Sequence, residues 1–367
     1  MPATTIRVRF ATNRNRTAGA DLFGPDFRDG NPAHYVTGTI DVAKISNLPD
    51  SGWAPLRKTL HIDPPSPPLN KVVATQDAHT TPATGMLEFA AARKQAEAVA
   101  PDTAGYGLVL LPGFASTFLD AMRRAAQIAN GYHAADVFCF SWPANGKVDL
   151  ENYLLDREDA SKSGAAIADA LAHLFATIGA MPAADRPKIH LVAHSMGNFA
   201  LRAAVQAIRR ADPDLIAHRV FEGALLMAAD EDLDSLSQAT KLGPLNQLAR
   251  HIAVYHAGGD MALTVSEQLN GPRLGLWGPQ DMANLARSIT SIDCSDVSAT
   301  QGDHGETHFS HQYYRLSSRV IGDVVQVLHG TSPDEIIGRL ADPTGGADGR
   351  AFWLPFDANA GFQTLTA

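Results

Sequence analysis

The chain has 367 residues, of which 45% are hydrophobic and 19% charged, and its net charge is −9. This balance is typical of a globular protein with a buried core and argues against a disordered chain. Because the charge is acidic and no block of basic residues occurs, we expect neither nucleic acid nor an anionic membrane surface as a partner. The length allows two ordinary domains or one large α/β domain with additions.

Residues 1–85 are predicted to form a strand-rich extension followed by a linker. Apolar and polar side chains alternate over Thr5–Ala11, and more loosely over Val36–Val42. Two shorter strands are predicted at Leu60–Asp63 and Val72–Ala74, beside proline-rich and polar segments typical of loops. The extension either adds strands to a larger sheet or forms a wall over the functional site.

Residues 86–331 alternate between short apolar runs and longer amphipathic segments. The apolar runs predict strands at Tyr106–Leu111, Asp136–Ser141, Ile189–Ala193, Val220–Met227, Ile252–His256 and Ile289–Cys294. The amphipathic segments predict helices at Thr117–Ala129, Glu151–Ile178, Met196–Ile208, Asp232–Gln238, Met261–Leu269 and Gln312–Leu328. This alternation indicates the α/β class, with a mostly parallel sheet and helices on both faces. Residues 332–367 are assigned to a C-terminal tail.

The cysteine content and the lengths of the apolar runs indicate where in the cell the protein is expected. The two cysteines, Cys139 and Cys294, each lie in an apolar run, so we expect buried thiols rather than a disulfide framework or a cysteine-rich metal site. The first residues lack the apolar core of a signal peptide, and no apolar run is long enough for a membrane span. We therefore expect a cytoplasmic protein.

The segment around Ser195 has the layout of a nucleophile elbow. A predicted buried strand ends at Ala193, and a predicted helix follows Ser195. Ala193 and Gly197 supply the small residues of the G-x-S-x-G pattern, with alanine in place of the first glycine. Such a turn exposes the serine oxygen above the sheet and directs a helix N-terminus toward developing negative charge. Ser195 is therefore the candidate nucleophile.

Two backbone N–H groups are expected to stabilise an oxyanion beside this serine. One is that of Met196, directly after the nucleophile. The other comes from the loop after the strand Tyr106–Leu111, where Gly113 permits a tight turn. We assign it to Phe114, with Ala115 as the alternative.

The acid that orients the base is expected after a later strand. Asp260 follows the strand Ile252–His256 and two glycines, which makes it the first choice. Asp230 and Asp232, after the preceding strand, are its rivals. Asp260 also has a simpler interpretation, since aspartate commonly caps a helix such as the one beginning at Met261.

The general base is expected between the last strand of the core and its last helix. Three histidines lie there, and His311, nearest the helix, is preferred over His308. Together with His304 they have plausible metal-ligand types, but the spacing is not H-E-x-x-H, so we expect no metal and no cofactor. His194, beside the nucleophile, is expected to pack or hydrogen-bond rather than act as the base.

These residues predict a serine hydrolase that cleaves small-molecule carboxylic esters through an acyl-enzyme. Only about two dozen residues join Met227 to Ile252, which leaves little room for a lid and favours an open site for short to medium acyl groups. Trp142, Tyr153 and Trp277 are candidates to line it. An acyltransferase or amidase with the same triad, or a non-catalytic binding protein, are the alternatives.

Several segments together resemble the DUF900 family of uncharacterised α/β hydrolases. They are Phe10–Arg14, Pro112–Phe118, Phe140–Pro143, Tyr153–Glu158, Ala193–Asn198, Asn270–Gly275 and Ser310–Tyr314. The resemblance implies an α/β-hydrolase fold and a triad whose roles fall by motif on Ser195, Asp260 and His311. The family usually has His-Gly-Phe-Asn where this chain has Pro112-Gly-Phe-Ala115. The two missing side chains normally brace the oxyanion loop, and proline stiffens it instead.

Overall fold

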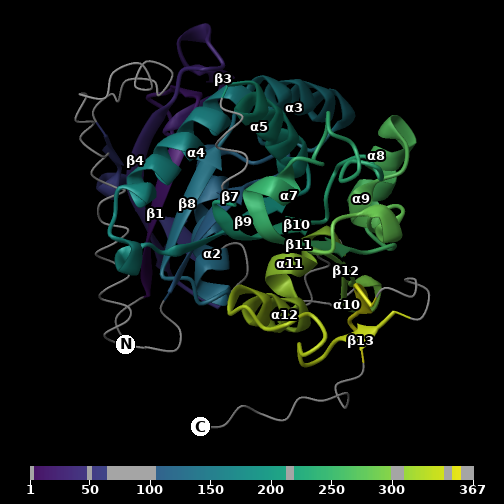
Figure 1. Ribbon diagram of the computed structural model, residues 1–367. Coiled ribbons are helices and arrows are strands. Elements are labelled where there is room, and N and C mark those ends of the chain that lie inside the picture. Colours follow the sequence, from purple (N-terminus) through teal and green to yellow (C-terminus); the bar gives the residue numbers. More distant parts are fainter. Residues whose placement is uncertain are drawn as a thin grey trace.

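The computed structural model describes residues 4–47, 52–63, 105–211, 219–298, 310–342 and 349–356. A sheet of 12 strands runs through the molecule and is flanked by helices (Figure 1). Its strands follow one another in the order β13 (Leu340–Ala341), β14 (Ala351–Trp353), β12 (Ile289–Asp293), β11 (Ala249–His256), β10 (Phe221–Met227), β9 (Lys188–His194), β7 (Tyr106–Leu111), β8 (Asp136–Ser141), β1 (Thr5–Thr12), β4 (Val36–Lys44) and β5 (Trp53–Pro55). A short strand, β6 (His61–Ile62), pairs with β4, and β2 (Arg14–Arg16) and β3 (Phe23–Phe27) form a separate ribbon.

The centre of the sheet is parallel, as predicted. Strands β8, β7, β9, β10, β11 and β12 pair in parallel register, and all six correspond to the predicted apolar runs. Strands β7 and β8 are buried along their whole length, which explains why their sequences are continuous rather than alternating. Carboxyl ends of parallel strands share one edge of a sheet, so the loops after β7, β9, β10 and β11 meet there.

Strands outside the core region extend this sheet at both edges. The N-terminal strand β1 pairs in parallel with β8, and β4 then pairs antiparallel with β1. A buried ion pair of 2.6 Å between Arg9 and Asp136 joins β1 to β8. At the opposite edge, β14 pairs in parallel with β12. The extension therefore adds strands to the main sheet, while the boundaries at residues 85 and 331 stay a prediction. The strand expected at Val72–Ala74 lies outside the described residues.

Helices cover both faces of the sheet, again as predicted. One apolar layer packs α3 (Leu150–Lys162), α4 (Gly164–Gly179) and α5 (Gly197–Ala211) against one face, and the other packs α2 (Phe118–Gly131) and α12 (Ser318–Leu328) against the opposite face (Figure 1). The remaining helix of the predicted set is α8 (Met261–Asn270). Both cysteines are buried free thiols. Within the described ranges, no helix is long and apolar enough to cross a membrane.

Three of the predicted helices differ from the structure. The long helix at Glu151–Ile178 is broken at Ser163, whose hydroxyl donates to the Asp159 carbonyl and accepts from the Asn13 amide. The helix expected at Asp232–Gln238 is wrong. This segment forms turns, because Asp232 makes a β-bridge with Arg273 and the following residue bonds to the same stretch of chain.

The helix predicted at Gln312–Leu328 is divided into shorter elements. A 3-10 turn at Ser310–Gln312 precedes α11 (Tyr313–Leu316), and α12 begins after Ser317. His311 lies on the 3-10 turn that precedes α11.

Candidate active site

Ser195 lies on a sharp turn between β9 and α5. Its φ is 54°, in the left-handed region that side chains other than glycine rarely adopt. The turn is fixed by its backbone, since the Ser195 N–H donates to the Met227 carbonyl at 2.9 Å and the Ser195 carbonyl accepts from the Asp230 N–H at 3.2 Å. The Asn198 amide adds a bond of 3.0 Å to the Ala193 carbonyl. This is the strained geometry that a nucleophile elbow requires.

Two glycines allow the turn and the loop after β7 to approach each other. A Cβ atom on Gly197 would lie 2.3 Å from the Leu111 carbonyl oxygen. A Cβ atom on Gly113 would lie 2.9 Å from Cβ of Ser195. The Pro112–Ser116 loop is therefore in direct contact with the nucleophile turn.

The predicted acid and base form a hydrogen-bonded pair. His311 Nδ1 lies 2.7 Å from Asp260 Oδ2, and the aspartate is fully buried. The second carboxylate oxygen of Asp260 accepts from the Leu263 N–H at 3.1 Å and so caps α8. Both interpretations of Asp260 are therefore compatible, because each uses a different oxygen. His304 and His308 lie outside the described residues.

The rival carboxylates have other partners. Asp230 accepts from the hydroxyls of Tyr153 and Ser266, and Asp232 pairs with Arg273 and Lys241. Neither contacts His311. The sequence pattern alone did not show which of the three aspartates is the acid, since Asp230, Asp232 and Asp260 all follow strands of the same sheet.

His194 connects the Ser195 turn to His311. Its Nε2 lies 3.1 Å from the His311 carbonyl oxygen and donates to it, and its ring centroid lies 4.7 Å from that of His311. The ring also stacks on Tyr314 at 4.2 Å. Burial lowers the pKa of His194 well below its ordinary value, which keeps the ring neutral. His194 therefore hydrogen-bonds and packs, as the sequence suggested.

His194 precedes Ser195 directly in the chain and contacts His311. Among the described residues, no hydrogen bond joins the Ser195 hydroxyl to the His311 ring. In structures without substrate such catalytic bonds are often long, and they tighten when substrate binds.

The backbone N–H groups of Met196 and Phe114 are expected to stabilise an oxyanion beside Ser195. Within the described part of the chain, neither the Met196 nor the Phe114 N–H donates a hydrogen bond. The N–H of Ala115, the alternative donor, is occupied by Asp156 Oδ2 at 2.9 Å. The geometry therefore favours Phe114 over Ala115.

The loop that carries Phe114 is held by buried side chains that the sequence did not single out. Asp156 binds the Ala115 N–H with one oxygen and the Asn145 N–H, at 3.0 Å, with the other. Burial raises the pKa of Asp156, and these two bonds act in the opposite direction. Trp142 donates from Nε1 to the Pro112 carbonyl at 2.9 Å. It is buried, so it supports the loop instead of lining the site.

Arg14 holds the other end of the loop. Its guanidinium is buried and donates to the carbonyls of Ser116, at 2.5 Å, and Ala144, at 2.7 Å. Burial lowers its pKa to about 10. Arg14 and Asp156 both belong to segments that carry the family resemblance, which was the available signal for their importance. Together they hold the loop that carries Phe114 from both sides.

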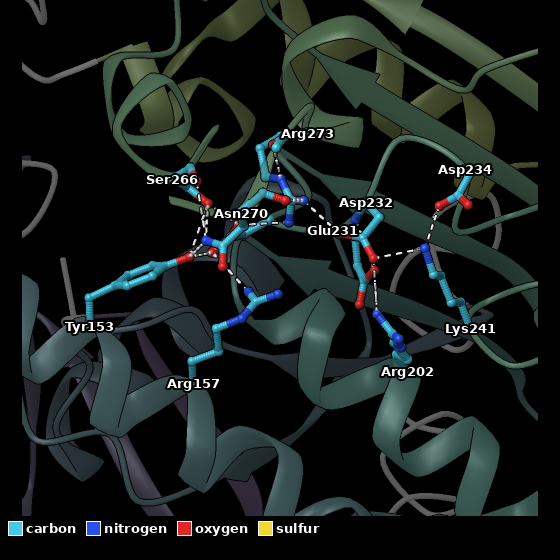
Figure 2. A network of polar contacts seen from close by, with 12 residues as sticks. Tyr153, Arg157, Arg202, Glu231, Asp232, Asp234, Lys241, Ser266, Asn270 and Arg273 are labelled. Atoms are coloured by element: carbon cyan, nitrogen blue, oxygen red, sulfur yellow. Dashed lines mark hydrogen bonds and ion pairs between the residues drawn. The ribbon is translucent and has the colours of Figure 1, made fainter. Parts of the chain in front are cut away.

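A polar network joins α3 to α8 behind the nucleophile turn (Figure 2). The Tyr153 hydroxyl of α3 donates to Asp230 at 2.8 Å, lies 3.0 Å from the Ser266 hydroxyl of α8 and accepts from Asn270 at 2.9 Å. Burial, with Asp230 nearby, raises the pKa of Tyr153 to about 12. Because the Asp230 N–H also binds the Ser195 carbonyl, the network fixes both helices relative to the nucleophile.

One member of this region is a buried carboxyl group. Glu231 is fully buried, and burial raises its pKa to about 7, although Arg202 nearby acts in the opposite direction. Its Oε2 accepts from the Asp232 N–H at 3.0 Å, while Oε1 has no hydrogen-bond partner. Burial therefore favours the protonated form of this carboxyl group.

No group of three or more histidine, cysteine or acidic side chains among the described residues could hold a metal ion. A family model described as an alpha/beta hydrolase of unknown function, DUF900, matches residues 88–329. No curated protein matches the chain.

Proposed function

The chain belongs to the DUF900 family of α/β hydrolases, and from this premise we propose that it is a serine hydrolase that cleaves carboxylic esters. The observation that carries the proposal is the bonded pair of His311 and Asp260, which lies one bridging residue away from Ser195 on its strained turn. This bonded pair, together with a serine on a strained turn, supports a Ser-His-Asp triad, which is recognised by geometry and roles.

The first half of the reaction forms an acyl-enzyme. The Ser195 oxygen attacks the ester carbonyl carbon while His311 accepts the hydroxyl proton. Asp260 keeps the proton of His311 on Nδ1, so that Nε2 is the basic nitrogen, and stabilises the imidazolium. The free N–H groups of Met196 and Phe114 stabilise the oxyanion. The intermediate then collapses, and the alcohol leaves with the proton from His311.

Water completes the cycle. His311 removes a proton from water, which attacks the acyl-enzyme carbonyl, and the second tetrahedral intermediate uses the same two N–H donors. Its collapse releases the carboxylic acid and returns the proton to Ser195. No cofactor takes part in these steps.

The substrate is proposed to be a small-molecule ester with a short to medium acyl group. Support comes from the turns between β10 and β11, which contain no inserted lid domain. Tyr153 packs edge-on against Phe114, with ring centroids 5.5 Å apart, and so lies beside the proposed oxyanion donor. Trp277 is largely exposed and is the second aromatic candidate. A cytoplasmic location is part of the same proposal.

Hydrolysis of p-nitrophenyl butyrate by the wild type and by Ser195→Ala tests the function. We expect turnover by the wild type and none above background by the variant, with equal circular dichroism spectra. Retained turnover in Ser195→Ala would exclude the serine mechanism, and absence of turnover in both would favour a binding protein. Added alcohol or amine distinguishes the related chemistries, because an acyltransferase would form a new ester or amide.

A further inference from the structure

Exposed apolar side chains gather on the two helices that flank the proposed site. The described residues include fourteen large apolar side chains that are exposed, and six of these lie on α3 and α8. They are Leu150, Leu154 and Leu155 of α3, and Met261, Val265 and Leu269 of α8, with 45–62% of each residue exposed. We call these six residues the α3–α8 rim.

The spacing of these residues gives each helix an apolar stripe on its outer side. Met261, Val265 and Leu269 are four residues apart on α8, and Leu150 and Leu154 are four apart on α3, so each set lies on one side of its helix. The inward side of α8 is formed by Leu263 and Ser266, which are buried. An amphipathic surface helix normally has a polar outer face, so core packing does not explain the outer stripe.

The two stripes lie on helices that are bonded to each other beside the proposed site. Tyr153, beside Leu154, is bonded to Ser266 and Asn270, which are beside Val265 and Leu269. The two helices therefore meet at Tyr153, and both lie in the upper part of the molecule in Figure 1.

Each helix also contributes to the catalytic geometry. Asp260, the proposed acid, caps α8 directly before Met261, and Asp156 of α3 holds the loop that carries Phe114. A surface that contacts the rim therefore faces the site.

We propose that the α3–α8 rim binds an uncharged or zwitterionic lipid surface, from which the ester substrate enters the site. The inference names the physical form of the substrate and rests on the proposed function. Exposed apolar patches of this kind mark interaction surfaces, and an amphipathic helix can lie in a membrane interface through its apolar stripe.

Charge selects this partner over an anionic surface. The exposed acidic groups on the two helices include Glu151 and Glu158, and the Lys162 ammonium is paired with Glu158 at 2.7 Å. With a net charge of −9 the chain is repelled by anionic lipid. A second copy of the chain on the rim would lie over the helices beside the proposed site, whereas a lipid surface there presents ester groups to it.

Co-sedimentation with phosphatidylcholine vesicles tests the proposal without turnover. We expect the wild type to bind, and the double variant Leu154→Gln/Val265→Gln to bind about 20-fold more weakly, because each change removes burial of roughly half an aliphatic side chain. The matched control is Ile45→Gln/Ile337→Gln, which replaces apolar residues of similar exposure (64% and 50%) outside the rim. The control should bind within about twofold of the wild type.

Further readouts separate this inference from the proposed function. The rim variant should hydrolyse a fully dissolved short ester as fast as the wild type, but lose its rate on an emulsified glyceryl ester. Lack of vesicle binding by the wild type overturns the inference even if soluble esters are cleaved, as does equal weakening in the control. Tighter binding to vesicles with anionic lipid, or a wild-type dimer that the rim variant dissociates in analytical ultracentrifugation, also overturns it.

Discussion

Replacement of Asp260 by asparagine separates the two roles of this carboxylate. In the structure Oδ1 caps α8 through the Leu263 N–H, while Oδ2 lies 2.7 Å from His311 Nδ1. Asparagine retains an oxygen for the cap but directs an NH₂ group at the imidazole. His311 then moves its proton to Nε2 in order to accept that bond, and it can no longer act as the base. We expect kcat to fall by about 10⁴-fold, the loss found when a triad loses its orienting acid.

Stability should respond differently from activity. Asparagine and aspartate are equally good N-caps, so Asp260→Asn should change the free energy of unfolding little. Asp260→Ala also removes the cap, which costs about 1 kcal/mol in addition. The two variants should therefore share one loss of activity and differ in stability.

The assay is kcat on p-nitrophenyl butyrate, combined with urea unfolding of each variant. Asp232→Asn is the matched control, because Asp232 belongs to the same region but pairs with Arg273 and Lys241. Asp260 is not the orienting acid if Asp260→Asn keeps more than about a tenth of the wild-type kcat, because a triad without its acid is expected to keep far less. An equal loss in Asp232→Asn would show that the wrong carboxylate was chosen.

The remaining predictions concern the oxyanion loop, the buried glutamate and the elbow. Asp156→Asn leaves one of two backbone N–H groups facing an amide NH₂, so the loop should shift and kcat should fall by about 10²-fold, and an unchanged kcat would contradict the bracing role. Glu231 binds its proton more tightly in the folded state, so wild-type stability should fall as pH rises from about 4.5 to about 7. Glu231→Gln should abolish this loss of stability, which amounts to about 3 kcal/mol once the wild-type glutamate is ionised. Urea unfolding of both proteins at low and at neutral to alkaline pH measures it, and the same pH dependence of stability in variant and wild type would contradict the prediction. Gly197→Ala should lower the free energy of unfolding by about 2–3 kcal/mol because its methyl group meets the Leu111 carbonyl, whereas Gly179→Ala, with open space around it, should cost nothing.

The fold was predictable where the signal is local. Six apolar runs predicted the parallel strands, and the small residues around Ser195 predicted a sharp turn that the structure has at φ 54°. A buried strand and a tight turn are each specified by a few neighbouring residues, so both can be predicted without knowledge of tertiary contacts.

The supports of the site were not predictable because they join residues far apart in the chain. Arg14 binds Ser116 across 102 positions, and Asp156 binds Ala115 across 41. Nothing in the local sequence of either residue shows which carbonyl or N–H it will meet. The sequence could not distinguish Asp260 from Asp230 for the same reason. Both residues follow strands, and only the contact with the distant His311 identifies Asp260.

Tertiary contacts also overrode one local pattern. The segment Asp232–Gln238 has helical periodicity, but its backbone and side chains bind the chain near Arg273 and Lys241. Aspartate and serine compete with the helix through such bonds. The resulting turns form part of the network behind the nucleophile.

Covalent labelling by a fluorophosphonate tests the central claim most directly, because the probe reacts only with a serine activated by a neighbouring base. The account predicts one adduct on the full-length protein, located on Ser195 by peptide mass spectrometry, absent in Ser195→Ala and formed far more slowly in Asp260→Asn. Absence of any adduct on the folded wild type, or an adduct on another serine, would contradict it.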